Sequence, residues 1–401
     1  MPNIELEEAL KIVLNSVSPN KETELIEISK ARGRICSENI FAPINNPPFN
    51  RSPLDGYALN SSDTHLATSK KPVTLCVIGE VCAGATFNKK LQCGEAIRIM
   101  TGAKIPDGCD CVIAQENTNY GENVVQIYKS LKPYENFCFL GEDIKKDTTI
   151  IRKGEKLSYI HLGVLASMGI QRISVIEKVR VGLLITGDEL TPLGNNLEEG
   201  KIYNSNLYLL QSRLEELSVE VTVMSPLKDH IVDVANAITM HIDDLDLLIT
   251  TGGVSVGKKD IFHDVLPLLC AKQYFWRVNI KPGTPVIYWE YRKKPIISLS
   301  GNPFAALTTF ELIARPLVSK LCYDPSLDLM HKKAIFKGSF TKKSATRRFL
   351  RGIFSEGEVS LPEGLLSSGA LYSMTYCNCL IDIEKGSQGL LDGQNIKIIL
   401  I

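Results

Sequence analysis

An alternation of strand-like and helix-like segments between residues 178 and 321 constrains the fold most strongly. Apolar runs in this stretch predict buried strands, and amphipathic segments predict helices. The strands are expected at 179–185, 220–224, 245–250 and 295–299, and the helices at 206–217, 231–242 and 304–321. Short connections between alternating strands and helices are typical of a doubly wound α/β sheet, in which ligands bind beyond the carboxyl ends of the strands.

Polar motifs follow three of these strands, at the edge where a ligand is expected: Thr186–Glu189, Gly252–Asp260 and Ser300–Pro303. The glycines of the second motif allow positive φ angles and a close approach of backbone N–H groups to a ligand. A loop that leads from a strand into a helix favours a bound anion, and Asp260 adds the carboxylate that a metal-assisted phosphate site needs. One glycine-rich loop is equally compatible with a plain tight turn, so the joint placement of the motifs carries the prediction.

Outside this region the pattern changes to short β-runs. An amphipathic helix is expected at 4–17, a helix with Ser158 as its N-cap at 158–170, and a β-rich insertion at 71–140. The part from about 325 reads as a small β-barrel or sandwich. We therefore predict an α/β multidomain protein with a linker and β-rich N-terminal domains at 1–177, a doubly wound α/β domain at 178–324 and a small C-terminal β-barrel domain at 325–401.

Charge balance and cysteine usage narrow the function classes. The 45 Lys and Arg of the 401-residue chain equal its 45 Asp and Glu, which argues against a protein that coats nucleic acid or an anionic membrane. The eleven cysteines form no CxxC pair, so reduced thiols are expected rather than disulfides or structural zinc. The N-terminus has no signal-peptide pattern, and no apolar run approaches the roughly 18 residues of a membrane span. We expect a cytoplasmic protein.

A basic run at 332–351 leaves three interpretations open. It holds eight Lys or Arg and no acid, with Phe336, Phe340 and Phe349 among them. It could bind nucleic acid, or attract a small anion to a nearby cleft. The favoured interpretation is a solvated face whose aromatic side chains turn inward.

Eight ordered motifs, spread over nearly the whole chain, carry a family resemblance. They are Pro47–Ala58, Arg98–Gly108, Gly141–Ile144, Thr186–Leu190, Asn204–Asn206, Gly252–Asp260, Lys281–Gly283 and Ser300–Pro303. Together they resemble the family of molybdopterin molybdenumtransferases, which includes MoeA proteins and the gephyrin E domain. The resemblance implies insertion of molybdate into adenylylated molybdopterin with release of AMP, and a requirement for Mg²⁺.

The resemblance also implies partners and site residues. The partners are the two substrates, a second copy of the chain and other molybdenum cofactor biosynthesis proteins, without nucleic acid or membrane. The implied Mg²⁺ ligands are Asp188, Glu189 and Asp260. The implied catalytic residues are these three, Lys281, and Asp55, Thr101 and Asp143, which would close the cleft from the other subunit of a homodimer. The implied substrate-binding residues are Asn206, Asp229, Gly252, Gly253, Ser255, Gly257, Pro282, Gly283, Ser300, Gly301, Asn302, Pro303, Arg351 and Ser368.

Plainer interpretations stand beside these assignments. Asp55 could be a turn residue before a glycine, Asp188 could cap a helix, and Lys281 could be an ordinary loop lysine. The alternatives to the transferase are a non-catalytic scaffold like gephyrin and a generic Mg-dependent nucleotide hydrolase. The intact carboxylates favour an enzyme, and the N-terminal motifs argue against a plain hydrolase.

The chain departs from the family pattern at a few positions. Thr284 stands where the family usually has the second lysine of Lys-Pro-Gly-Lys-Pro, so one cation is missing or is supplied elsewhere. Ser300 replaces a common proline and Asn50 a frequent aspartate. None of these changes removes a carboxylate assigned to the metal.

Overall fold

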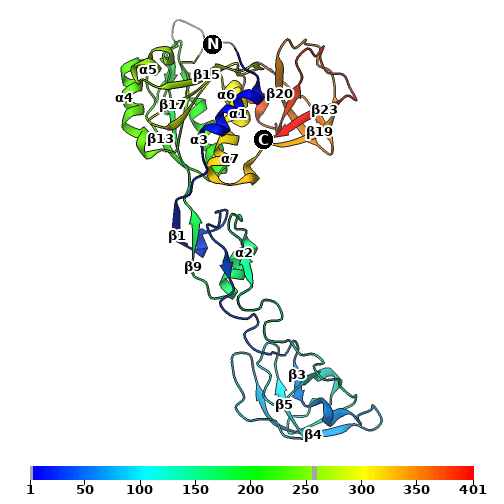
Figure 1. The fold of residues 1–401 in the computed structure, drawn as a ribbon. Helices are drawn as coiled ribbons and strands as arrows, with labels where there is room; N and C mark the ends of the chain where they lie inside the picture. The colour runs from blue at the N-terminus through cyan, green and yellow to red at the C-terminus, as the bar shows by residue number, and fades with distance from the viewer. Residues whose placement is uncertain (1–2, 255–259) are drawn as a thin grey trace. The chain divides into compact units, whose positions relative to one another are not determined.

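The structure, a computed structural model, describes residues 3–254 and 260–401 and divides into two compact units (Figure 1). The large unit combines the residues up to Glu24 with Ile176–Ile401, and the small unit is Leu25–Val175. The chain therefore leaves the large unit once and returns to it. No helix in the described part of the chain is long and apolar enough to cross a membrane.

A six-stranded sheet forms the centre of the large unit, in the order β13-β10-β14-β18-β17-β15. Its parallel part comprises β13 (Glu220–Val223), β10 (Arg180–Ile185), β14 (Leu247–Thr251) and β18 (Lys294–Leu299). Its antiparallel edge comprises β17 (Pro285–Tyr291) and β15 (Lys272–Arg277). The predicted doubly wound α/β fold is confirmed. The antiparallel edge was not predicted, because no helix separates its strands in the sequence.

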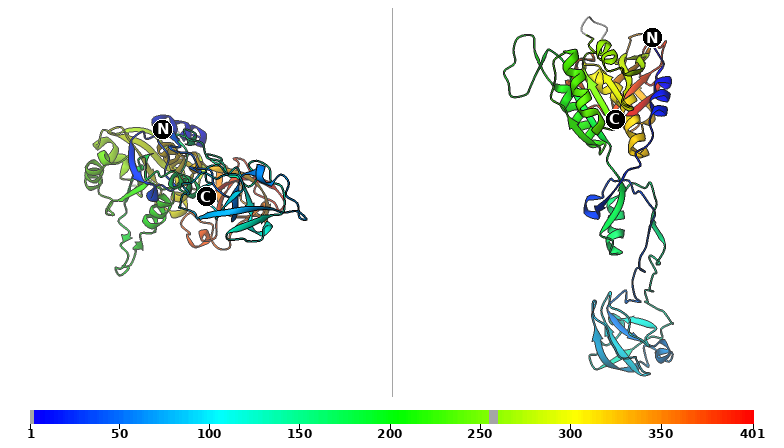
Figure 2. Two further views of the ribbon diagram at one scale, coloured as in Figure 1. Left: turned by 90° about the horizontal axis from the view of Figure 1, so that it is seen from below. Right: turned by 60° about the vertical axis from the view of Figure 1, so that its left-hand side comes forward.

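Helices cover both faces of this sheet (Figures 1 and 2). One face carries α1 (Leu6–Ser16), α3 (Ser205–Glu216), α6 (Pro303–Thr309) and α7 (Arg315–Cys322), and the other α4 (Ile231–His241) and α5 (Phe262–Leu268). Successive residues of a strand point to opposite faces. Leu183 of β10 is accordingly buried with the first set of helices, and Leu184 with the second.

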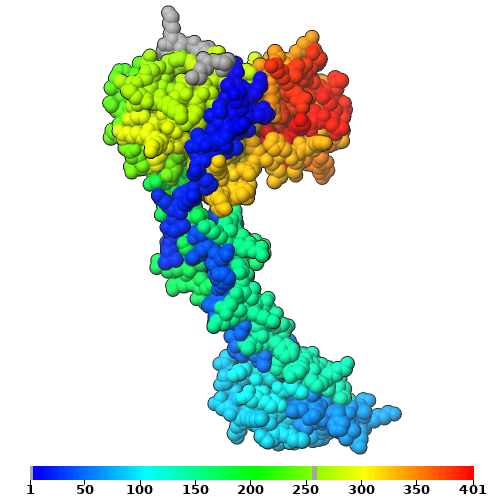
Figure 3. All heavy atoms as spheres, viewed as in Figure 1, coloured from blue at the N-terminus to red at the C-terminus, as the bar shows by residue number. Residues whose placement is uncertain are grey.

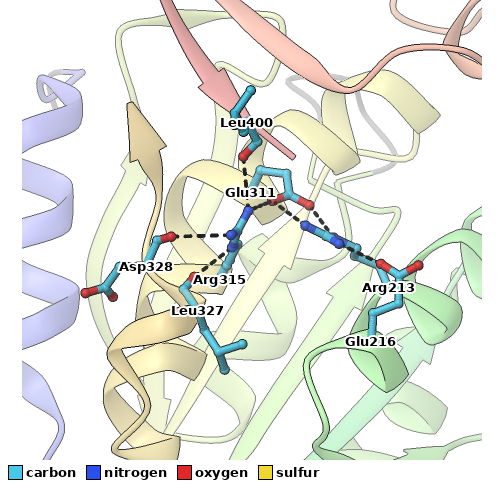
Figure 4. Close-up of polar contacts among 7 residues, drawn as sticks. All are labelled: Arg213, Glu216, Glu311, Arg315, Leu327, Asp328 and Leu400. Carbon is cyan, nitrogen blue, oxygen red and sulfur yellow. Dashed lines mark hydrogen bonds and ion pairs between the residues drawn. The ribbon is translucent and has the colours of Figure 1, made fainter. Parts of the chain in front are cut away.

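A π-helical turn, Phe310–Ala314, joins α6 to α7 within the segment predicted as one helix. Its Glu311 side chain is fully buried and forms ion pairs with Arg213 at 2.7 Å and Arg315 at 3.0 Å (Figure 4). Arg315 also donates to the carbonyl oxygens of Leu327 and Leu400. Because Leu400 lies in the last strand of the chain, this network ties the C-terminal domain to the α/β domain.

The C-terminal domain is a closed five-stranded barrel, because β20 pairs with both β21 and β22. Its strands are β19 (Met330–Lys337), β20 (Arg347–Ser355), β21 (Glu358–Ser360), β22 (Cys379–Ile383) and β23 (Asn395–Leu400). The predicted small C-terminal barrel is confirmed.

The basic run contributes aromatic side chains to the protein core and lysines to its surface. Phe336 and Phe349 are fully buried, whereas Lys332, Lys333 and Lys337 are exposed. The favoured interpretation of inward-turned aromatic side chains is confirmed for this part of the run.

Helix α1 lies on the surface of the large unit and contacts both of its domains (blue in Figure 3). Its Leu6, Ala9 and Val13 pack into the α/β core. Its Glu7 pairs with Arg347 of the barrel, and Arg347 also binds Asp382 at 2.7 Å. The predicted first helix thus belongs structurally with residues far along the chain.

The small unit contains a five-stranded sheet with the order β6-β3-β5-β4-β7. These strands are β3 (Gly56–Leu59), β4 (Val73–Val81), β5 (Glu95–Ile99), β6 (Cys111–Ala114) and β7 (Val124–Ile127). A Cβ atom at Gly56 would lie 1.8 Å from the Ile113 carbonyl oxygen, so only glycine fits there.

The other elements of this part of the chain are short. Helix α2 (Tyr159–Ser167) is capped by Ser158, as predicted. Strand β1 (Thr23–Glu27) pairs with β9 (Arg172–Ile176), and β2 (Ile40–Phe41) with β8 (Thr149–Ile151).

Candidate active site

A cleft of about 780 Å³ lies beyond the carboxyl ends of β10, β14 and β18, between the α/β domain and the C-terminal barrel. Its lining brings together all three strand-end motifs of the sequence. The predicted residues that line it are Glu189, Asn206, Asp229, Gly252, Gly253, Lys281, Pro282, Gly283, Ser300, Gly301, Asn302, Pro303 and Ser368. The predicted Ser255 and Gly257 lie outside the described residues.

Close packing of two strand ends forms the floor of the cleft. Gly252 has a φ angle of +95°, and a Cβ atom there would lie 2.1 Å from the Thr186 carbonyl oxygen. The Thr186 N–H donates to the Thr251 carbonyl oxygen at 2.9 Å, which holds the two ends side by side. Residue 252 must therefore be glycine, because only glycine allows the ends of β10 and β14 to lie this close together.

Asp229 interacts with two other acids, Asp188 and Glu189, and of these three residues Glu189 and Asp229 line the cleft. Asp229 donates its backbone N–H to the Asp188 carboxylate at 3.2 Å. Burial raises the pKa of Asp229, and the nearby charges of Asp188 and Glu189 raise it further. Asp260 is 8% exposed, and burial raises its pKa to about 7. Such groups gain from a nearby cation, which would offset their desolvation.

The fit to a divalent cation is partial without a substrate. Both oxygens of Asp260 lack a well-formed hydrogen bond within the described residues, although the Phe262 N–H lies near enough to lower the pKa of Asp260 slightly. Within the same residues, no three His, Cys, Asp or Glu side chains are gathered closely enough to hold a metal ion. A Mg²⁺ ion here would need further oxygen ligands, which water and substrate phosphates usually provide.

Unpaired polar atoms of other residues also converge on the cleft. Asn204 Nδ2, Asn206 Oδ1 and Thr251 Oγ1 are buried and have no hydrogen-bond partner among the described residues. All three residues line the cleft. Most buried polar groups in proteins are hydrogen-bonded, so this concentration indicates a surface built for a polar ligand.

Ser368 and Arg351, both predicted to bind substrate, take different positions. Ser368 lines the cleft, and its carbonyl oxygen accepts the Phe304 N–H at the start of α6. Arg351 is 1% exposed and does not line the cleft. Its guanidinium stacks on the Phe304 ring at 3.9 Å and donates to the carbonyl oxygens of Ser367 and Ala370. It therefore supports the loop that carries Ser368.

Asp55, Thr101 and Asp143 belong to the small unit, whereas the residues of the cleft belong to the large unit. One Asp55 oxygen accepts both the backbone N–H and the hydroxyl of Thr101, each at 2.7 Å. These hydrogen bonds lower the pKa of Asp55. Asp143 accepts a hydrogen bond from the Asn46 side chain at 3.2 Å. Thr101 thus orients the Asp55 carboxylate and favours its charged form.

Some features of the site departed from the sequence interpretation. Leu190 begins a short strand, β11 (Leu190–Thr191), which pairs with β12 (Ile202–Tyr203), so the interpretation of Asp188 as a helix cap is wrong. Thr251 and Asn204 were not named as site residues. A hydroxyl directly before the first glycine of the loop was the available signal for Thr251.

Comparisons with known proteins match this arrangement along the whole chain. Family models described as the MoeA N-terminal region (domain I and II), a probable molybdopterin binding domain and the MoeA C-terminal region (domain IV) match residues 4–169, 182–320 and 333–401. A molybdopterin molybdenumtransferase of Haemophilus influenzae is 33% identical over 399 residues, which is 98% of this chain and 97% of the relative. One from Staphylococcus aureus is 32% identical over 400 residues, 99% of this chain and 95% of the relative.

Solved structures agree with these relatives. A crystal structure of a molybdopterin biosynthesis MoeA protein from Pyrococcus horikoshii has a TM-score of 0.87 and 31% sequence identity, covering 100% of this chain and 99% of that one. A second structure of this kind from the same organism has a TM-score of 0.82 and 28% identity.

Proposed function

The chain belongs to the MoeA family of molybdopterin molybdenumtransferases, which act in molybdenum cofactor biosynthesis, and we propose that it inserts molybdate into adenylylated molybdopterin with release of AMP. The substrate is a pterin dithiolene joined to AMP by a pyrophosphate. It is large, polar and strongly anionic.

The observation that carries this proposal is the set of unpaired buried groups at one cleft. Asn204, Asn206 and Thr251 offer both donors and acceptors there. Asp260, a buried carboxylate, belongs to the same sequence motif as the lining Gly252 and Gly253. A volume of about 780 Å³ suits a nucleotide-sized ligand. The polar groups would exchange water for substrate atoms when the ligand binds.

Asp188, Glu189 and Asp260 are the residues proposed to hold a Mg²⁺ ion for the substrate pyrophosphate. The raised pKa of the buried Asp260 supports its part in this assignment, since a divalent cation would keep it ionised at neutral pH. When bound, the ion would supply charge stabilisation to the departing phosphate of AMP. The three carboxylates would position the ion.

Other residues of the cleft would orient the adenylylated pterin and molybdate. The glycine backbone at 252 and 253 allows the substrate to approach the strand ends closely. Lys281 and the Ser300 hydroxyl are the groups proposed to hold molybdate, a tetrahedral dianion.

We also propose a cytoplasmic homodimer. Asp55 and Thr101 belong to the small unit and the cleft residues to the large unit, so a site that uses both sets can be completed by a second copy of the chain. All eleven cysteines are free thiols, as in proteins of a reducing compartment.

Reconstitution tests the proposed function. The purified protein, adenylylated molybdopterin, Mg²⁺ and molybdate should yield a pterin that contains molybdenum, and omission of the protein should abolish the product at low molybdate. If the protein binds the adenylylated pterin but leaves it unchanged, the scaffold alternative is correct and the transferase proposal is wrong.

A further inference from the structure

The cations of the cleft come from two domains. Among the described lining residues they are Lys281 of the α/β domain, and Lys342 and Arg348 of the C-terminal domain. Lys281 lies in the two-residue strand β16 (Ile280–Lys281). This strand pairs with β20 of the barrel, so the cleft wall is a sheet continued across the domain boundary.

The register of this pairing places Arg348 beside Lys281. The strands are parallel, with Ile280 opposite Arg347 and Lys281 opposite Arg348. Side chains of paired residues in neighbouring strands point to the same face, and adjacent residues of a strand to opposite faces. Arg347 therefore points away from the cleft, toward Asp382 and Glu7, while Arg348 points toward the face of Lys281.

Arg348 is held in place but keeps most of its guanidinium free. Its Nε donates to the buried Ser344 hydroxyl at 2.7 Å, and its guanidinium lies 6.0 Å from the Phe340 ring centroid. Within the described residues, its two terminal nitrogens make no hydrogen bond and no carboxylate pairs with it. Two parallel N–H groups of this kind match the oxygens of a phosphate or molybdate.

Position 284 supplies no charge to the same wall. Thr284 lines the cleft, but its hydroxyl donates to the Ile280 carbonyl oxygen at 2.6 Å. Position 284 therefore lacks the positive charge of the lysine that the family usually has there. A neighbouring strand instead brings in a cation 64 residues further along the chain, as counted from 284 to 348.

We propose that Arg348 binds a tetrahedral oxyanion of the substrates jointly with Lys281, in place of the lysine missing at 284. This inference rests on the proposed function for the identity of the anion, which is either free molybdate or a phosphate of adenylylated molybdopterin. It makes the C-terminal barrel a direct part of the substrate site.

Direct binding and steady-state kinetics test this inference together. Arg348→Gln should raise the Kd for molybdate in calorimetry, or the KM for adenylylated molybdopterin, by about tenfold, as expected for a lost hydrogen bond to a charged group. Arg348→Lys should recover only part of the loss, because an ammonium lacks the two-pronged geometry. Lys343→Gln is the matched control, since Lys343 lies in the same basic run but does not line the cleft.

A rescue experiment separates anion binding from damage to the fold. Thr284→Lys added to Arg348→Gln should restore most of the lost affinity, and thermal unfolding should show that both variants fold. A higher Kd for molybdate identifies molybdate as the anion, and a higher KM for the adenylylated pterin alone identifies the phosphate.

Unchanged values for both ligands in Arg348→Gln would overturn the inference. Equal losses in Arg348→Gln and Lys343→Gln would also overturn it, because they would reflect bulk charge. If the wild-type protein binds molybdate but produces no cofactor, the proposed function fails, while the binding comparison still decides the role of Arg348.

Discussion

At the scale of single residues, desolvation sets the chemistry of the carboxylates in the site. Burial raises the pKa of both Asp260 and Asp229, and the neighbouring acids Asp188 and Glu189 raise that of Asp229 further. By contrast, hydrogen bonds from Thr101 lower the pKa of Asp55. Asp260 and Asp229 are therefore suited to hold a cation, whereas hydrogen bonds hold the Asp55 carboxylate in place.

Substitution of the proposed metal ligands tests this division. Asp260→Asn and Glu189→Gln should each lower turnover at least about a hundredfold, because a neutral amide holds Mg²⁺ less well and weakens charge stabilisation at the leaving phosphate. Asp244→Asn, at an exposed position outside the cleft, is the control. Wild-type rates in either variant across a Mg²⁺ titration would remove that carboxylate from the metal site.

In the metal-free protein, Asp260 should also make the free energy of unfolding depend on pH. Its pKa is about 7 in the folded protein against an ordinary 3.8, so the folded state prefers the protonated form. Its contribution to stability is fully present below pH 3.8 and is lost as the pH rises through 7.

The Asp260→Asn variant should therefore gain stability relative to wild type between pH 4 and 7, by at most about 1.4 kcal/mol per pH unit. Thermal unfolding in the presence of a chelator measures this difference. A difference that does not vary with pH would show that Asp260 titrates normally.

At the scale of elements, the Glu311 network positions Arg315, which links the α/β domain to the last strand of the C-terminal domain (Figure 4). Glu311→Gln leaves Arg213 and Arg315 without their buried counter-charge, which costs about 3–5 kcal/mol. The apparent Tm should fall by at least about 6 °C. Glu216→Gln removes a carboxylate that is 63% exposed and pairs with the same Arg213, so it should change Tm by less than about 2 °C. Similar shifts in the two variants would contradict a special role for the buried pair.

The sequence predicted elements well where periodicity was long and regular. The four strands and three helices predicted in 178–321 appear within a few residues of their expected bounds, because one face or both faces of each element are buried. Strand β16 could not be predicted, since two residues carry no period. The π-helical turn was also hidden, because one extra residue hardly changes the pattern of an apolar helix.

The same limit applies to the site. The strand-end motifs gave most of the cleft, because topology alone brings the carboxyl ends of parallel strands together. The position of Arg348 beside Lys281 depends on the register of β16 with β20, which pairs residues 67 positions apart, from 281 to 348. The basic run indicated only that some cation was available. The burial of Arg351 under the Ser368 loop was likewise set by tertiary packing.

At the scale of the whole molecule, the account predicts a dimer with shared sites. Sedimentation should give about twice the chain mass of 44.3 kDa. Asp55→Asn and Asp260→Asn should each inactivate the protein, but co-expression of the two variants should restore about a quarter of wild-type activity. Half of the dimers are then mixed, and each mixed dimer has one intact site built from both chains. No recovery on co-expression would place both residues in the site of one subunit.

The measurement that tests the central claim most directly is AMP release as a function of molybdate. With adenylylated molybdopterin and Mg²⁺ held constant, the account predicts that AMP appears only when molybdate is present, in a one-to-one ratio to the molybdenum inserted into the pterin. AMP release at the same rate without molybdate would contradict the account, and would identify the protein as a hydrolase of the adenylylated pterin.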